Sequence, residues 1–125
     1  MPSLKTSLKI AVLTAEPERF RGALTLAAAQ AALGGEVAMF LQLDAVALLR
    51  PPVAAAQDAA HAAAGLPTLA QLLDDAMELG VAISVCQSGL ALVRLSAADL
   101  DSRISVTGPV AWLKQKNDID QLLMS

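Results

Sequence analysis

The sequence predicts one α/β domain over residues 1–125, a three-layer sandwich with a mainly parallel sheet of about five strands and helices on both faces. Helical and strand patterns alternate in two units, residues 8–41 and 66–85. Gly34-Gly35 and Gly80 each end a predicted helix, and an apolar strand pattern follows directly. A chain of 125 residues is long enough to bury one hydrophobic core, so a single domain is expected.

The first unit contains the clearest elements. Residues 8–13 form an apolar run with one charge, which is typical of a strand covered on both faces. Pro17 favours a helix start, and the expected helix covers Glu18–Leu33. Residues 37–41 form the second buried strand. The helix is alanine-rich and apolar on more than one side, which predicts contact with the sheet on one side and with another subunit on the other.

The alanine-rich segment 53–65 follows a short helix expected at residues 45–49. Alanine favours helix, but the segment holds no large side chain that could anchor one to a core. We therefore expect a mobile loop or a loosely held helix. His61 is the only histidine of the chain and is expected to be solvated rather than catalytic.

Leu66-Pro67-Thr68 opens the next predicted helix, which continues to Leu79. Its apolar side chains share one side, and Asp74, Asp75 and Glu78 lie on the other. The simplest interpretation of these three carboxylates is a solvated face. Metal binding is the lesser alternative, because no further ligands are in view.

The C-terminal part is predicted as short elements. Residues 96–99 have capping-box spacing, 104–106 form a short strand, and a helix runs from Gly108-Pro109 to about Lys116. Trp112 on that helix is expected to fill the core or an interface rather than to stack on a ligand. Residues 118–124 are expected to form a closing strand, with a helical turn as the alternative.

Composition excludes several classes of protein. Nine basic and twelve acidic residues give a net charge of −3, with no basic cluster that would bind nucleic acid. The longest apolar region, residues 37–49, is interrupted by polar residues and is too short to cross a membrane. No secretory signal pattern is present at the N-terminus, so a cytoplasmic location is expected. One cysteine and one histidine predict neither a disulfide nor a metal site, and no cofactor motif is present.

The stretch around the single cysteine carries the candidate chemistry. The β-branched run Val81–Val85 predicts a buried strand that ends at Cys86. Gln87, Ser88 and Gly89 fit the turn that opens a helix, where free backbone N–H groups would favour the thiolate. We therefore predict a reactive thiol at the tip of a strand. The alternative is a structural cysteine buried in the core, which is the common state of unpaired cysteine.

The order of these elements resembles the DsrE/DsrF-like family of sulfur-relay proteins over roughly residues 8–124. The most telling parts are Glu-Pro-Glu-Arg-Phe at 16–20, Gly-Gly-Glu-Val-Ala-Met-Phe-Leu at 34–41, and residues 66–90 up to and beyond Cys86. The resemblance implies a flavodoxin-like sandwich and assembly into trimers, hexamers or mixed complexes. It also implies that the cysteine at this position carries sulfur as a persulfide, although some members lack it and serve in assembly.

The leading hypothesis is a sulfur carrier or sulfurtransferase with Cys86 as the catalytic residue and Gln87, Ser88 and Gly89 contacting the substrate. A sole cysteine favours persulfide carriage, because a second thiol would resolve the persulfide into a disulfide. The resemblance implies sulfur-donor and sulfur-acceptor proteins as partners, and a homotrimer or homohexamer. Two alternatives stay open: a non-catalytic assembly subunit, and a redox sensor whose thiol is oxidised or capped.

Overall fold

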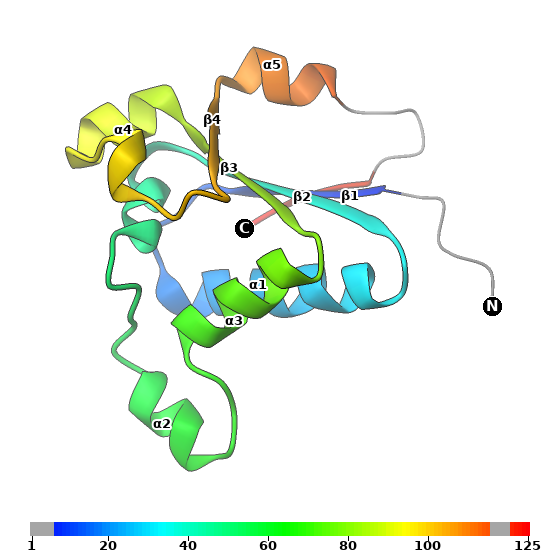
Figure 1. Cartoon of the computed structure of the whole chain (residues 1–125), viewed down its shortest axis with the longest axis vertical. Helices are drawn as coiled ribbons and strands as arrows, with labels where there is room; N and C mark the ends of the chain where they lie inside the picture. Colours follow the sequence, from blue (N-terminus) through cyan, green and yellow to red (C-terminus); the bar gives the residue numbers. More distant parts are fainter. Residues whose placement is uncertain (1–6, 116–120) are drawn as a thin grey trace.

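The computed structural model describes residues 7–115 and 121–125 (Figure 1). Its strands are β1 (Ser7–Val12), β2 (Glu36–Leu41), β3 (Ala82–Cys86), β4 (Ser105–Thr107) and β5 (Gln121–Met124). Its α-helices are α1 (Pro17–Ala32), α2 (Asp58–Ala63), α3 (Leu69–Glu78), α4 (Gln87–Val93) and α5 (Pro109–Lys114), and two 3-10 helices are η1 (Leu43–Leu49) and η2 (Ala97–Asp99). The expected helix end at 116 and strand start at 118 lie outside the described residues.

All five strands are parallel, in the order β4-β3-β2-β1-β5, which confirms the predicted α/β fold. Residues 121–124 form a strand beside β1, so the strand was the correct interpretation of that segment rather than the helical turn. The carboxyl ends of parallel strands meet at one edge of the sheet. Cys86, the last residue of β3, therefore lies at that edge, opposite Thr107 of β4.

The helix ends follow local chemistry that the sequence displays. The Glu16 side chain accepts a hydrogen bond from the Arg19 N–H at 2.7 Å, and Pro17 begins α1. Thr68 and Gln71 form a capping box at the start of α3. After α3 the chain turns through Gly80 with a φ of +99°, a conformation that side-chain-bearing residues rarely adopt.

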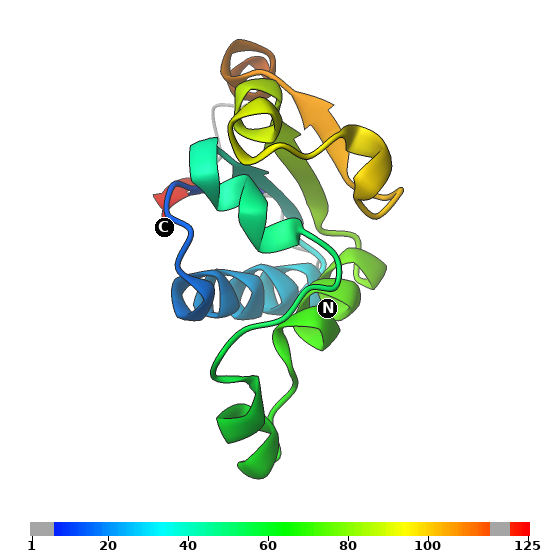
Figure 2. The same cartoon turned by 90° about the vertical axis from the view of Figure 1, so that its left-hand side faces the viewer.

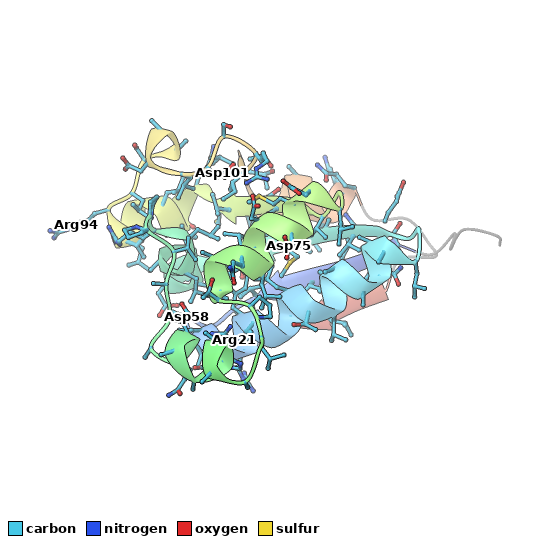
Figure 3. The ribbon with its side chains drawn as sticks, turned by 60° about the horizontal axis from the view of Figure 1, so that its bottom comes forward. Arg21, Asp58, Asp75, Arg94 and Asp101 are labelled. Atoms are coloured by element: carbon cyan, nitrogen blue, oxygen red, sulfur yellow. The ribbon has the colours of Figure 1, made fainter. Side chains whose placement is uncertain are left out.

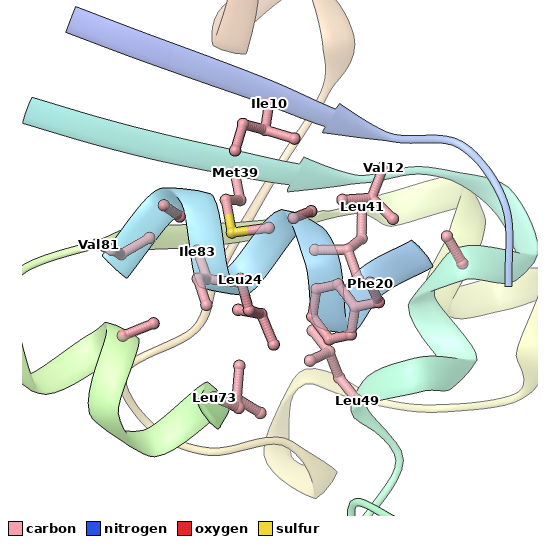
Figure 4. Packing of buried hydrophobic residues seen from close by; sticks show 14 of the residues in the cluster. Ile10, Val12, Phe20, Leu24, Met39, Leu41, Leu49, Leu73, Val81 and Ile83 are labelled. Atoms are coloured by element: carbon pink, nitrogen blue, oxygen red, sulfur yellow. The ribbon is translucent and has the colours of Figure 1, made fainter. Parts of the chain in front are cut away.

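The main core lies on one face of the sheet, under α1 and α3 (Figure 4). Alternate residues of the three central strands point into it, and the helices contribute the facing side chains. Its labelled members are Ile10, Val12, Met39, Leu41, Val81 and Ile83 on the sheet side and Phe20, Leu24, Leu49 and Leu73 on the helical side.

The opposite face carries much less cover. In Figure 1, α5 lies on the far side of the sheet from α1 and α3. Its six residues bring Trp112 onto a small second cluster with Ala11, Phe40 and Cys86. Helices therefore lie on both faces as predicted, but the two outer layers are very unequal.

The alanine-rich segment forms α2, which extends away from the body of the domain (Figures 1 and 2). None of its residues is buried, in agreement with the lack of anchoring side chains. Its N-terminal residue nevertheless has strong polar contacts, which the sequence analysis did not anticipate. Asp58 accepts a hydrogen bond from Arg21 Nη2 at 2.7 Å and further bonds from the N–H groups of Ala55 and Leu69 (Figure 3).

Arg21 of α1 is the centre of this contact and is only 6% exposed. It also donates to the Pro67 carbonyl at 3.0 Å and to Glu18 at 3.3 Å. His61 lies 2.9 Å from the second Glu18 oxygen, so it is half-buried in an ionic network rather than simply solvated. The N-terminus of α2, which we expected to be loosely held, is thus joined to α1 through Asp58 and Arg21.

The acidic side of α3 is exposed as predicted. Asp74 pairs with Arg103 at 2.8 Å, and Arg103 also pairs with Asp101. Both pairs lie at the surface, where ion pairs contribute little to stability.

Candidate functional site

Cys86 is placed by the alternation of β3. Ile83 and Val85 point into the main core, and the intervening Ser84 and Cys86 point to the thinly covered face. The chain enters α4 immediately after the cysteine, whose backbone is still extended. Cys86 is therefore both the end of a buried strand and the residue that precedes a helix, as the sequence predicted.

One hydrogen bond reaches the sulfur, and two backbone N–H groups act on it electrostatically. The Ser88 hydroxyl lies 3.0 Å from Cys86 Sγ, and the backbone N–H groups of Ser88 and Gly89 also face it. Burial is the largest single influence and raises the pKa of the thiol. The Ser88 hydroxyl and the N–H groups of Gly89 and Ser88 together outweigh it, and the pKa of Cys86 lies below the ordinary cysteine value. The thiolate, which is the nucleophilic form, is favoured by these contacts.

Gly89 has a packing role as well as an N–H group for the sulfur. A Cβ at this position would lie 2.5 Å from Val46 Cγ2 and 2.8 Å from the Leu43 carbonyl oxygen, both in η1. These distances are too short for a real contact, so only glycine lets α4 pack against η1 without a shift. The close packing holds the start of α4 where its N–H groups reach the sulfur.

Two aromatic side chains share a small buried cluster with the thiol. Trp112 stacks on Phe40 with ring centroids 5.1 Å apart, and both contact the cluster that contains Cys86. The Lys9 ammonium lies 5.0 Å from the centre of the Trp112 ring, a cation–π contact that helps to hold the indole. Trp112 is buried and fills a core, which confirms one of the two roles expected for it.

The site is more closed than we expected. A reactive thiol at the tip of a strand would be expected to be partly open, whereas Cys86 is 5% exposed. Gln87 and Ser88 are exposed, so the start of α4 forms the outer rim of the site. Little of the sulfur is therefore accessible to a reagent in this structure.

The structure brings two of the predicted contact residues to the sulfur. Ser88 and Gly89 reach it, whereas Gln87 is on the rim and takes part in no side-chain hydrogen bond of the described chain. Lys9 and Phe40 were missed, because their proximity to the site depends on the strand register. The single charge in 8–13 could have assigned Lys9 to the weaker face.

Residues 7–115 and 121–125 contain neither a metal-binding cluster nor a membrane-spanning helix. No group of three or more His, Cys, Asp or Glu side chains in these residues could hold a metal ion. No described helix has the length and hydropathy needed to cross a membrane.

Comparisons with known proteins agree with this architecture. The structure is similar to that of the YchN protein from E. coli, with a TM-score of 0.72 and 15% identity over 96% of this chain and 99% of that one. It is equally similar to MTH1491 from Methanobacterium thermoautotrophicum, a protein of unknown function, with a TM-score of 0.72 and 10% identity over 97% of this chain and 100% of the other. No curated protein sequence matches the chain.

A family model establishes the relationship that the fold and the cysteine stretch suggest. The DsrE/DsrF-like family model matches residues 8–124, which is nearly the whole chain. Family membership suggests sulfur relay as the general function. This chain, with its parallel five-stranded sheet and its single cysteine at the end of β3, belongs to the DsrE/DsrF-like family.

Proposed function

We propose that this protein carries sulfane sulfur as a persulfide on Cys86 and passes it to a partner protein in intracellular sulfur trafficking. The observation that supports this most directly is the Ser88 hydroxyl 3.0 Å from the sulfur, together with the backbone N–H groups of Ser88 and Gly89 that lower the pKa of the thiol. They stabilise the thiolate needed to accept sulfur. They also stabilise the thiolate that leaves when the sulfur moves on.

The transfer needs no oxidant or metal. The Cys86 thiolate attacks the terminal sulfur of a donor persulfide, a Cys86–sulfur bond forms, and the donor's sulfur–sulfur bond breaks to release the donor thiolate. An acceptor thiolate then attacks the outer sulfur, and Cys86 leaves as the thiolate. Each step exchanges one sulfur–sulfur bond for another, so the electrons balance. The partners are therefore a sulfur-donor and a sulfur-acceptor protein, each with a reactive thiol, and repeated turnover would make the protein a sulfurtransferase.

We also infer a closed homo-oligomer, a trimer or a hexamer, as the family resemblance implies, and a cytoplasmic location. The alanine-rich α1 is consistent with this, because from Gly22 to Gly35 it and its C-terminal turn carry no charged residue. Burial between subunits would supply apolar area that alanine alone provides sparingly.

One observation favours a second candidate function. A cysteine that is 5% exposed is also what a non-catalytic assembly subunit with a structural thiol would have. A redox sensor, the third hypothesis, would need the thiol to meet an oxidant and has no separate support in the site.

Intact-mass spectrometry after incubation with a sulfane-sulfur donor separates these candidates. A carrier gains one sulfur atom per chain, and a thiol reductant removes it. Cys86→Ser gains nothing and keeps its far-UV circular dichroism, because the hydroxyl is close in size to the thiol. An unmodified wild-type chain supports the assembly subunit, and an oxygen adduct on Cys86 supports the redox sensor. A Cys86→Ser variant that fails to fold would assign the cysteine to packing.

A further inference from the structure

A polar side chain, that of Thr107, lies beside Cys86 on the adjacent strand β4. The two residues pair in the parallel register of β3 and β4. Two positions earlier in each strand, the Ser84 and Ser105 hydroxyls lie 2.8 Å apart on the thinly covered face of the sheet. Because side chains alternate along a strand, Thr107 points to the same face as Cys86.

Gln42 occupies the matching position on the other side of Cys86. The paired residues of β2 and β3 end one position before Gln42 and Cys86, so these two residues lie at the same level. The backbone of Gln42 is still extended, with φ −110° and ψ 153°. It lines an apolar hollow of about 230 Å³ with Phe40 and Trp112, which both belong to the cluster that contains Cys86. Gln42 therefore lies on the thinly covered face as well.

Both polar groups are available to a bound ligand. No hydrogen bond within residues 7–115 and 121–125 uses the Gln42 amide or the Thr107 hydroxyl. Both residues are half-buried. Neither group is fully enclosed, since Thr14 Oγ1 is the only fully buried side-chain N or O atom without a partner in this part of the chain. Two partly desolvated donors without acceptors thus stand on either side of the reactive sulfur.

Sulfur bound to Cys86 would change which atom needs hydrogen bonds. In the free thiolate the charge is on Sγ, and the Ser88 hydroxyl lies 3.0 Å from it. In an ionised persulfide the charge is on the outer sulfur, about 2.05 Å beyond Sγ. Adjacent strands are about 4.8 Å apart, so side chains at the level of Cys86 can reach this sulfur from both sides. Amide N–H groups and hydroxyls are donors, and bonds to a charged acceptor are the stronger kind.

We propose that Gln42 and Thr107 hold the outer sulfur of the Cys86 persulfide, each through one hydrogen bond to that sulfur. The inference rests on the proposed function and deepens it, because it names the side chains that bind the cargo. Ser88 and Gly89 serve the cysteine sulfur, and Gln42 and Thr107 serve the sulfur that is transferred. The two added bonds keep the outer sulfur in its ionised form.

The test compares the unloaded thiol with the loaded persulfide of the full chain. Each protein is loaded with inorganic polysulfide, and alkylation by iodoacetamide is followed across pH by intact mass. Gln42→Leu removes the amide, and Thr107→Val removes the hydroxyl at nearly constant size. Thr107→Ser keeps the hydroxyl. Gln57→Leu is the matched control, because Gln57 is exposed before α2 and its side chain caps nothing. Circular dichroism checks that each variant is folded.

We expect the alkylation midpoint of the persulfide to rise by about one pH unit in Gln42→Leu and in Thr107→Val, because each loses a hydrogen bond to a charged sulfur. Thr107→Ser and Gln57→Leu should keep the wild-type midpoint. The midpoint of the unloaded thiol should stay the same in all variants, since neither Gln42 nor Thr107 contributes to the lowered pKa of Cys86.

Two results overturn the inference and leave sulfur carriage intact. One is a loaded Gln42→Leu or Thr107→Val protein whose persulfide keeps the wild-type midpoint. The other is an equal shift of the unloaded thiol, which would assign the effect to the general surroundings of Cys86. A wild type that takes up no sulfur overturns the proposed function, and this inference with it.

Discussion

The Ser88 hydroxyl is the side chain whose effect on the thiol is easiest to isolate. It is exposed at the rim and lies 3.0 Å from Cys86 Sγ. Ser88→Ala removes the side-chain hydrogen bond that opposes the effect of burial, so we expect the pKa of Cys86 to rise. The alkylation rate at neutral pH should fall severalfold, because a smaller fraction of the thiol is ionised.

A pH profile of alkylation by iodoacetamide tests this expectation, with Ser84→Ala as control. Ser84 lies on the same face of β3 but bonds to Ser105, 2.8 Å away, and not to the sulfur. The wild-type midpoint should lie below that of a free cysteine and move upward only in Ser88→Ala. An equal shift in both variants would assign the effect to general loosening of the strand end.

The residues around the thiol show what sequence can and cannot predict at this scale. Cys86, Ser88 and Gly89 are neighbours in the chain, and a strand-to-helix turn brings them together by local geometry alone. Lys9, Phe40 and Trp112 come from three separate elements. Their contacts depend on the register between β1 and β2 and on where the chain places α5. No local pattern in the sequence indicates that register or that placement.

At the scale of elements, we expect the short helix α5 to control access to Cys86. Trp112 is the buried residue of α5 and packs in the cluster that covers the sulfur. Trp112→Ala should raise the rate of Cys86 alkylation by about tenfold or more, since losing ~1.4 kcal/mol of closing energy changes an opening equilibrium tenfold.

A variant that destabilises the main core, under α1 and α3, distinguishes local opening around Cys86 from global unfolding. Leu73→Ala removes a buried side chain of α3 on the opposite face and is expected to cost about 2–5 kcal/mol. Stopped-flow alkylation should show faster reaction in Trp112→Ala than in Leu73→Ala at matched stability. Equal rates would mean that the thiol is reached only through unfolding.

The base of α2 is the second element with a specific expectation. The Arg21 guanidinium, together with the N–H groups of Leu69 and Ala55, lowers the pKa of Asp58 to about 2. A carboxyl whose pKa is depressed in the folded state stabilises the fold fully above its unfolded value, and this contribution disappears as pH falls through the folded value. Asp58→Asn should therefore lower the Tm at neutral pH, and the difference from wild type should shrink between about pH 4 and 2.

Thermal melts across this pH range provide the measurement, with Asp75→Asn as the control. Asp75 is exposed on α3 and has no ion pair within the described chain. A wild-type advantage over Asp58→Asn that stays constant from neutral pH to pH 2 would contradict the role given to the carboxylate charge.

At the scale of the whole molecule, subunit association should make stability depend on concentration. Burial at an interface favours the folded assembly over unfolded chains, so the Tm of an oligomer rises with protein concentration. We expect such a rise for this protein over a hundredfold range in a calorimetric or circular dichroism melt. A constant Tm at all concentrations would indicate that each chain folds and remains alone.

The overall fold was largely predictable because its signals are repeated and consistent. Apolar runs at 8–13 and 37–41 gave the strands, and Gly34 and Gly80 marked where helices ended. The unequal layers were not predictable, since the short α5 and the long α1 both have apolar residues, and only the assembled sheet shows how little α5 covers. The ionic base of α2 was missed because Arg21 and Asp58 lie 37 positions apart.

Trp112 is the only tryptophan of the chain, and it packs in the cluster that contains the only cysteine. Its fluorescence therefore comes from a single indole beside the sulfur that would carry the cargo. We expect a chemical change at the sulfur to alter the emission of this indole, which would let loading and unloading be followed optically without a label. Movement of α5 away from Phe40 would also shift the emission toward longer wavelengths as water reaches the ring. The cover over the thiol can thus serve as an intrinsic spectroscopic reporter of both opening and sulfur occupancy.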